Sequence, residues 1–181
     1  FATAVTNASN LNKTLVASMG NEKPPACTSH PFPYQEYPAQ FPEVIAVTAT
    51  NQNDQFPKPP QYPVTYNYGT KAELSAPGIG IVTTTGSNSY SIGTGGNPAP
   101  LNGTSYSAPL VAALVALMYD INPQITNSQV RTILQTTPVD LPPSGRDQEF
   151  GFGRIDAYRA VREAIPQFNW YPSAAWTQRP S

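Results

Sequence analysis

The chain has 181 residues, of which 39% are hydrophobic and 12% are charged, so it can form one domain with a sizeable core. Its net charge of -1 leaves no positive surplus to neutralise a phosphate backbone or to hold an anionic membrane. No apolar run of about eighteen residues is present, and the start of the chain lacks the features of a signal peptide. We therefore expect a soluble protein without a nucleic-acid or membrane partner.

The first half of the chain contains two short apolar runs that predict buried strands, at residues 15–17 and 44–47, and residues 73–78 predict a short strand that a turn ends. Long loops rich in Pro and aromatic residues separate them. Gly20 and Asn21 follow the first run, which places a side-chain amide at the carboxyl end of a strand, where open α/β sheets bind ligands. This placement favours a functional role for Asn21.

Helices are predicted mainly in the second half. Residues 106–119 carry apolar side chains three and four positions apart and on almost every side, which predicts a wholly buried helix with Pro109 in its first turn. A capping-box pattern at 126–129 opens a second helix through about 135, and residues 155–165 predict a third. Strands followed by helices indicate an α/β domain.

The remaining features leave alternatives open. Cys27 has no partner in the chain, so it is a free thiol, a buried small side chain or half of a bridge to another polypeptide. The aromatic, Pro-containing tail at 166–181 either packs on its own domain or anchors a partner. Sequons at Asn7, Asn12 and Asn102 would be glycosylated only in a eukaryotic secretory setting.

Ser105 opens the long predicted helix. The first N–H groups of a helix lack intrahelical partners and carry partial positive charge, so a serine there can attack a carbonyl while the backbone stabilises the oxyanion. Gly103 lets a substrate carbonyl come close. The alternative is that Ser105 or Thr104 is an ordinary N-cap.

The stretch Gly103-Thr104-Ser105, followed two residues later by Ala108-Pro109, resembles the nucleophile motif of the subtilisin-like serine proteases. Four further segments resemble that family in the right order. They are Gly20-Asn21-Glu22, residues 37–47, residues 74–78 and residues 151–157. The resemblance covers about residues 1–165, apart from stretches near 55–64 and 93–101.

The resemblance implies a three-layer α/β fold with a mostly parallel sheet, of which residues 1–165 would form only the C-terminal half. Ser105 would be the acyl-forming nucleophile, and the Asn21 amide and the Ser105 N–H would form the oxyanion hole. Gly103 and Thr104 would also contact substrate.

The same resemblance implies a pocket for the residue before the cleaved bond. Ser18, Met19 and Gly20 would line one wall of it. Glu36 would lie near its bottom, where a carboxylate favours a basic substrate side chain.

No cofactor is required by this chemistry. The resemblance places a weak structural cation, such as calcium, at three backbone carbonyls that precede the second strand. These carbonyls belong to Ala39, Phe41 and Val44. It also implies a cis peptide bond between Tyr37 and Pro38.

The chain differs from the family in the position of the residues that could act as the catalytic base. Its one histidine, His30, and all its aspartates follow Asn21, whereas the family order is Asp, His, Asn, Ser. We therefore expect a partner chain or fragment of the same protease to supply the catalytic Asp and His. The expected function is a secreted or extracytoplasmic serine endopeptidase acting on peptides or proteins. The alternatives are an inactive scaffold or binding subunit, and a structural subunit that works through its Pro/Tyr loops and tail.

Overall fold

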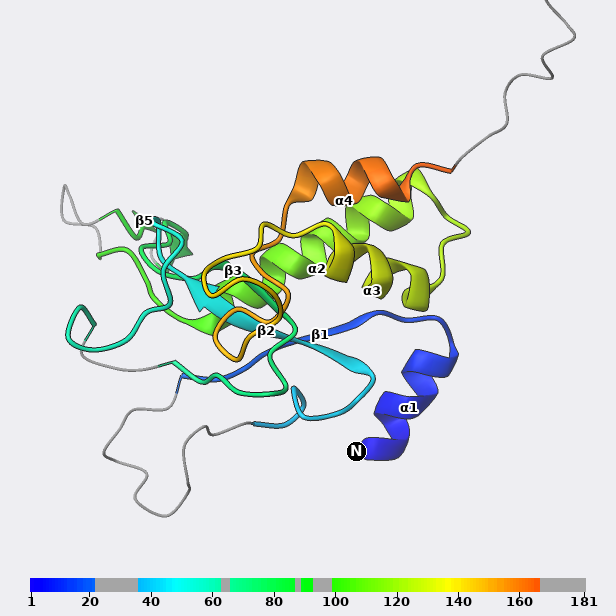
Figure 1. Cartoon of the computed structure of the whole chain (residues 1–181), viewed down its shortest axis with the longest axis horizontal. Coiled ribbons are helices and arrows are strands. Elements are labelled where there is room, and N and C mark those ends of the chain that lie inside the picture. Colours follow the sequence, from blue (N-terminus) through cyan, green and yellow to red (C-terminus); the bar gives the residue numbers. More distant parts are fainter. Residues whose placement is uncertain (22–35, 63–65, 87–88, 93–98, 167–181) are drawn as a thin grey trace, which may run out of the picture.

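The computed structural model describes residues 1–21, 36–62, 66–86, 89–92 and 99–166. Its elements follow the order expected from the sequence (Figure 1). They are α1 (Ala2–Asn10), β1 (Leu15–Ser18), β2 (Val44–Thr50), β3 (Leu74–Pro77), β4 (Thr84–Thr85), β5 (Ser89–Tyr90), α2 (Thr104–Ile121), α3 (Asn127–Thr136) and α4 (Ala157–Ala164). His30, Cys27 and the tail beyond 166 lie outside the described residues, so the expectations about them stay open.

The centre of the fold is a parallel sheet in the order β1-β2-β3. Leu15 pairs with Val44, and Val47 pairs with Leu74. Every residue of β2 is buried, as expected for the middle strand of a parallel sheet that is covered on both faces. This arrangement confirms the α/β fold with a parallel sheet.

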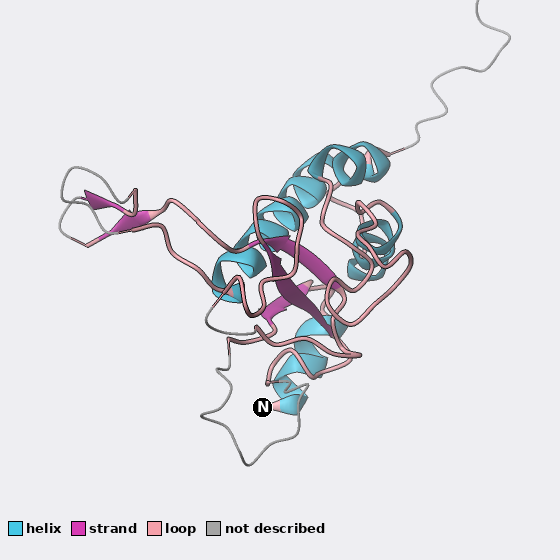
Figure 2. Ribbon diagram, turned by 60° about the vertical axis from the view of Figure 1, so that its left-hand side comes forward, coloured by secondary structure: helices cyan, strands magenta, loops and turns pink. Residues whose placement is uncertain are grey.

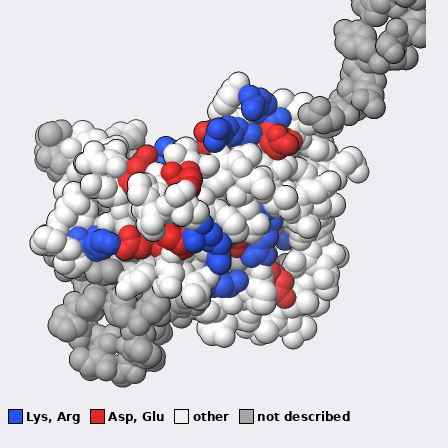
Figure 3. Space-filling view, viewed as in Figure 1, with Lys and Arg blue, Asp and Glu red and all other residues white. Residues whose placement is uncertain are grey.

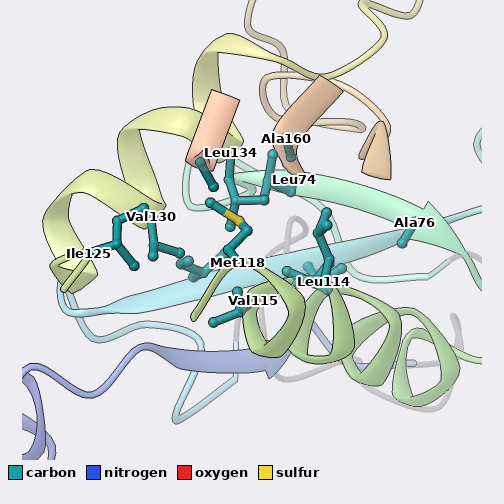
Figure 4. Packing of buried hydrophobic residues seen from close by; sticks show 13 residues of the cluster. Leu74, Ala76, Leu114, Val115, Met118, Ile125, Val130, Leu134 and Ala160 are labelled. Atoms are coloured by element: carbon teal, nitrogen blue, oxygen red, sulfur yellow. The ribbon is translucent and has the colours of Figure 1, made fainter. Parts of the chain in front are cut away.

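The two faces of the sheet carry separate hydrophobic cores, so the domain has three layers. On one face Ile45 and Val47 pack with residues of α2, α3 and α4, among them Met118 and Val130 (Figure 4). On the other face Val44 and Ala46 share a core with Val5 of α1 and the fully buried Met19. Alternating β2 side chains therefore serve the two layers of helices.

Helix α2 differs from the prediction in two respects. It begins at Thr104, so Pro109 lies in its second turn and not in the first. It is also not buried all round: Val111, Leu114 and Met118 face the core, whereas Leu110 is 41% exposed and Leu117 is 53% exposed. By length and composition this helix could cross a membrane, but a core helix has the same composition, and α2 packs on all three parallel strands. The apolar pattern was correctly assigned to packing surfaces, but part of the apolar surface of α2 is exposed in the described part of the chain.

The Pro/Tyr-rich loop after β2 packs on its own domain. Phe56 and Tyr66 are buried with Leu141 and Phe150, and Lys58 forms an ion pair with Glu149. The described aromatic rings of this loop therefore contribute to a satellite core. This weakens the alternative in which the loop is an exposed working surface.

Charged residues of both signs alternate along a band on the face seen in Figure 3, and much of that face is uncharged. The described residues of this face present no field of one sign over a large area.

Candidate active site

Ser105 lies in the first turn of α2 and is exposed. The N-cap residue of α2 is Gly103, which has no side chain to bond to the helix. Neither Ser105 nor Thr104 is therefore the N-cap. The N–H of Ser105 is among the first four of the helix, which have no intrahelical acceptor. Ser105 therefore combines an accessible hydroxyl with an N–H donor at the positive end of a long helix.

The side chain of Asn21 caps α2 from the end of β1. Its Oδ1 accepts the backbone N–H of Thr104 at 2.8 Å and lies 2.9 Å from the Thr104 hydroxyl oxygen. Because a backbone N–H can only donate, the atom that faces it must be the amide oxygen. The amide Nδ2 therefore remains on the other side of the group, where it can donate to a ligand beside Ser105.

Thr104 fastens the end of β1 to the start of α2. Its buried hydroxyl accepts the N–H of Gly20 at 3.2 Å and lies at hydrogen-bond distance from the Gly20 carbonyl. With the Asn21 contacts, these bonds bring together residues that are more than 80 positions apart. The structure thus places Asn21, Thr104 and Ser105 side by side, as the resemblance implies.

Of the two glycines near Ser105, only Gly78 is explained by close approach. A Cβ on Gly103 would lie 3.4 Å from the Asn21 amide nitrogen, which is an ordinary van der Waals contact. A Cβ on Gly78 would collide with the hydroxyl oxygen of Ser107, which donates to the Ala76 carbonyl at 3.0 Å. The N–H of Gly103 also donates to the Gly78 carbonyl at 2.7 Å. These contacts hold the start of α2 against the carboxyl end of β3.

Sequence reasoning missed Ser107 and Asn67 as supports of this region. Asn67 is fully buried, its Nδ2 donates to the Met19 carbonyl at 2.9 Å, and its N–H donates to the Gly20 carbonyl at 3.2 Å. Asn67 lies in a loop without periodicity or a recognisable motif. Nothing in the sequence marked it.

The residues predicted to line a substrate pocket lie at the end of β1. Ser18 is half-buried, and Met19 is fully buried, with its N–H donating to the Val47 carbonyl and its carbonyl accepting from Asn67. Gly20 has a φ of +105°, and the carboxylate of Glu36 lies beside it. The role of these residues towards a substrate stays a prediction.

The predicted cation carbonyls lie in the loop that leads into β2. The Phe41 carbonyl accepts the Val44 N–H at 3.1 Å, and Arg131 donates to the neighbouring Pro42 carbonyl at 2.6 Å. Within the described ranges no three His, Cys, Asp or Glu side chains gather to hold a metal. A cation at Ala39, Phe41 and Val44 stays a prediction, and the chemistry of Ser105 does not need it. The Tyr37–Pro38 peptide bond is cis, which confirms that expectation.

Four of the aspartates have structural partners away from Ser105. Asp54 pairs with Arg154, Asp140 accepts from Ser144 and Gly145, Asp147 accepts from two backbone N–H groups, and Asp156 caps α4. The described residues contain no histidine. The described part of the chain therefore brings the Asn21 amide close to the turn that carries the exposed Ser105, and it contains no histidine that could act as a base there.

The comparisons with known proteins agree with this geometry. The profile of the Subtilase family matches residues 1–153. Similar proteins include the minor extracellular protease Epr of Bacillus subtilis, 34% identical over 90% of this chain and 23% of its own length. Subtilisin BL of Lederbergia lenta is 31% identical over 88% of this chain and 50% of its own length. The chain therefore spans half or less of the length of these relatives, and it belongs to the subtilase family of serine proteases.

Proposed function

We propose that Ser105 is the nucleophile of a serine endopeptidase that becomes active when a second half-domain supplies a histidine and an aspartate. The observation that carries the proposal is the attachment of Asn21 to the residue before Ser105, at 2.8 Å. A scaffold would need neither an exposed serine at a helix start nor an amide held beside it. The names of the relatives, which include an extracellular protease, support a location outside the cytoplasm.

The positions of Ser105 and Asn21 support the following reaction. The Ser105 oxygen attacks a peptide carbonyl carbon while the histidine of the second half takes its proton. Negative charge develops on the carbonyl oxygen, where the Asn21 Nδ2 and the Ser105 N–H can donate to it. The histidine then gives its proton to the leaving amine, and water hydrolyses the ester on Ser105 by the same steps.

The second half-domain has a place to bind at the β1 edge. In the described sheet β1 is an end strand that pairs only with β2, and an uncovered parallel edge is rare because its backbone groups need partners. Ala112 and Ala116 of α2 line a hollow of about 480 Å³ with residues 11–14, which lead into β1. We expect a parallel strand along β1 and a helix against Ala112 and Ala116.

Ser105 lies on that same side of α2. The spacings of seven residues to Ala112 and four more to Ala116 correspond to about two turns and one turn, so the three residues share one helix face. A half-domain packed on the two alanines therefore meets the nucleophile at the end of the same face. This supports a catalytic base that comes from the half-domain on the uncovered side of α2, and not from the described residues.

The test is peptide hydrolysis by the full-length protein, with Ser105→Ala compared with Ser128→Ala. Ser128 is an exposed serine of α3. Loss of the nucleophile should lower kcat by at least about 10⁴-fold, whereas Ser128→Ala should leave it unchanged. If the unaltered protein, shown to contain both halves, hydrolyses no peptide, the catalytically inactive scaffold replaces this proposal.

A further inference from the structure

The β4–β5 hairpin projects from the rest of the described chain and turns apolar side chains to solvent (Figure 2). Thr84 pairs with Tyr90, and side chains alternate along each strand, so Val82, Thr84 and Tyr90 lie on one face. Val82 is 58% exposed, Tyr90 is 56% exposed, and Ile92, two residues further on, is 43% exposed. Single exposed apolar residues are common, but three on one small hairpin indicate a contact surface, which we call the apolar hairpin face.

The other face of the hairpin is polar and bonded within itself. Ser91 is fully buried, its N–H donates to the Thr83 carbonyl at 2.9 Å, and its Oγ accepts the Thr83 N–H at 2.8 Å. The hydroxyl groups of Thr85 and Ser89 also bond to each other. The polar face therefore joins the two strands, and the apolar residues on the opposite face are not needed for that purpose.

The base of the hairpin is fixed close to Ser105. Ile81 and Leu101 exchange two backbone hydrogen bonds of 2.9 Å, and the Oδ1 of Asn102 accepts the Gly80 N–H at 2.7 Å. Ser105 follows Leu101 by four residues. The apolar hairpin face therefore lies within about 30 Å of Ser105, a distance that roughly nine residues of extended polypeptide span.

Two observations favour a substrate chain as the occupant of this face. Residues 74–119, which include the hairpin, Ser105 and most of α2, contain no Asp, Glu, Lys, Arg or His, so an uncharged apolar segment fits them better than a charged partner. The hairpin follows β3, whereas the second half-domain is expected along β1, at the other end of the described sheet. A polypeptide bound at Ser105 is thus the macromolecule that already lies beside the hairpin.

We propose that the apolar hairpin face is a secondary binding site for an apolar segment of the substrate, several residues away from the cleaved bond. This inference rests on the proposed function and narrows its substrates to polypeptides long enough to reach the hairpin. Contacts remote from the reacting atoms are the same before and during the reaction. The site should therefore lower KM and leave kcat unchanged.

The experiment measures kcat and KM of the full-length protein on peptides that share one cleavable sequence. One peptide is short, and the others are extended by about ten residues before or after that sequence, with either Leu and Phe or Ser and Gly. Tyr90→Ser removes an exposed ring of the hairpin, and Tyr158→Ser, at a 73% exposed position of α4, is the matched control. We expect one of the two apolar extensions to lower KM by about tenfold, and Tyr90→Ser to remove most of this gain. The short peptide and the control variant should be unaffected.

The other outcomes identify a different role for the hairpin. Extensions that never lower KM, or a gain that survives in Tyr90→Ser combined with Val82→Thr, would overturn this inference and leave Ser105 as the nucleophile. If the gain survives and Tyr90→Ser instead lowers the melting temperature, the second half-domain covers this face. If the gain survives and the variant converts a dimer to a monomer in sedimentation, a second copy covers it. Absence of cleavage of every peptide would overturn the proposed function as well.

Discussion

At the β3 edge of the sheet, residues 151–155 continue the hydrogen bonding, whereas β1 at the other edge pairs only with β2 in the described chain. The Ser75 N–H donates to the Gly153 carbonyl at 2.9 Å, and the Ile155 N–H donates to the Ser75 carbonyl at 3.0 Å. Gly151 permits this approach, because a Cβ there would collide with the backbone of Glu73. Residues 151–155 therefore continue the sheet at the β3 edge, whereas no further strand lies along the β1 edge among the described residues.

The two edges of the sheet are expected to differ in their effects on stability and on activity. The start of the β3 edge is reinforced by a partly buried ion pair between Glu73 and Arg131, at the opposite end of β3 from the contacts with Gly103 and Ser107. The β1 edge carries Asn21 at its end and lies beside the uncovered face of α2. Changes at the β3 edge should therefore alter folding with little effect on turnover, and changes at the β1 side should do the reverse.

The β4–β5 hairpin adds a third region to this contrast. It projects away from the rest of the described chain in Figure 2, and its exposed side chains include Tyr90 and Ile92. It departs from Gly78 and returns at Gly103, where the two backbones are joined at 2.7 Å. The hairpin thus begins and ends beside Ser105.

The largest expected effect is at the uncovered face of α2. Ala116→Arg should place an unpaired charge in the interface with the second half-domain and weaken its docking by about 4 kcal/mol, because a buried charge needs a partner. The melting temperature and peptide hydrolysis of the full-length protein both report this loss. Thr132→Arg on the exposed side of α3 is the control. Full activity of Ala116→Arg would show that this face stays uncovered.

The next largest effect is expected for the oxyanion donor at the end of β1. Asn21→Ala should lower kcat by about 10²- to 10³-fold, or about 3 to 4 kcal/mol, a magnitude taken over from subtilisin, a member of this family. KM should change little, because the donor acts mainly on the oxyanion. Steady-state kinetics on one peptide measure both constants. A rise in KM of the same size, with kcat unchanged, would show that Asn21 is not part of the oxyanion hole.

The β3 edge gives the opposite signature. Arg131→Met removes the cationic partner of Glu73, whose side chain is only 5% exposed and keeps one hydrogen bond from Gln135, and should lower the free energy of unfolding by about 3 kcal/mol. Adding Glu73→Gln should restore most of the loss, because the buried charge is then gone. Urea unfolding measures the stability, and kcat should stay unchanged. A large drop in kcat for the folded variant would show that the β3 edge also affects turnover.

The smallest effect is at the start of α3. Thr126 and Gln129 form a reciprocal capping box, so Thr126→Ala should lower the free energy of unfolding by about 1 kcal/mol. Thr132→Ala, within the same helix, serves as the comparison. Equal effects of the two variants would mean that the cap adds nothing.

The fold could be predicted because its signals are local and repeated. The apolar runs gave the three strands, the capping box gave α3, and the nucleophile motif located Ser105 at a helix start. The interpretation of α2 as a wholly buried helix was wrong, because periodicity reports which side chains are apolar and not whether a partner covers them. Asn67 could not be found, since its role arises from contacts with β1 nearly 50 residues earlier. The docking of a second half and the role of Glu36 stay predictions.

We expect Ser105 to become an activated nucleophile once the β1 side is covered. Labelling of the full-length protein with a fluorophosphonate, followed by mass spectrometry of all co-purifying chains, measures this activation. The label should appear on Ser105 and should be lost when the protein is unfolded before the reaction. An unlabelled Ser105 in a folded preparation that contains both halves of the domain would contradict it.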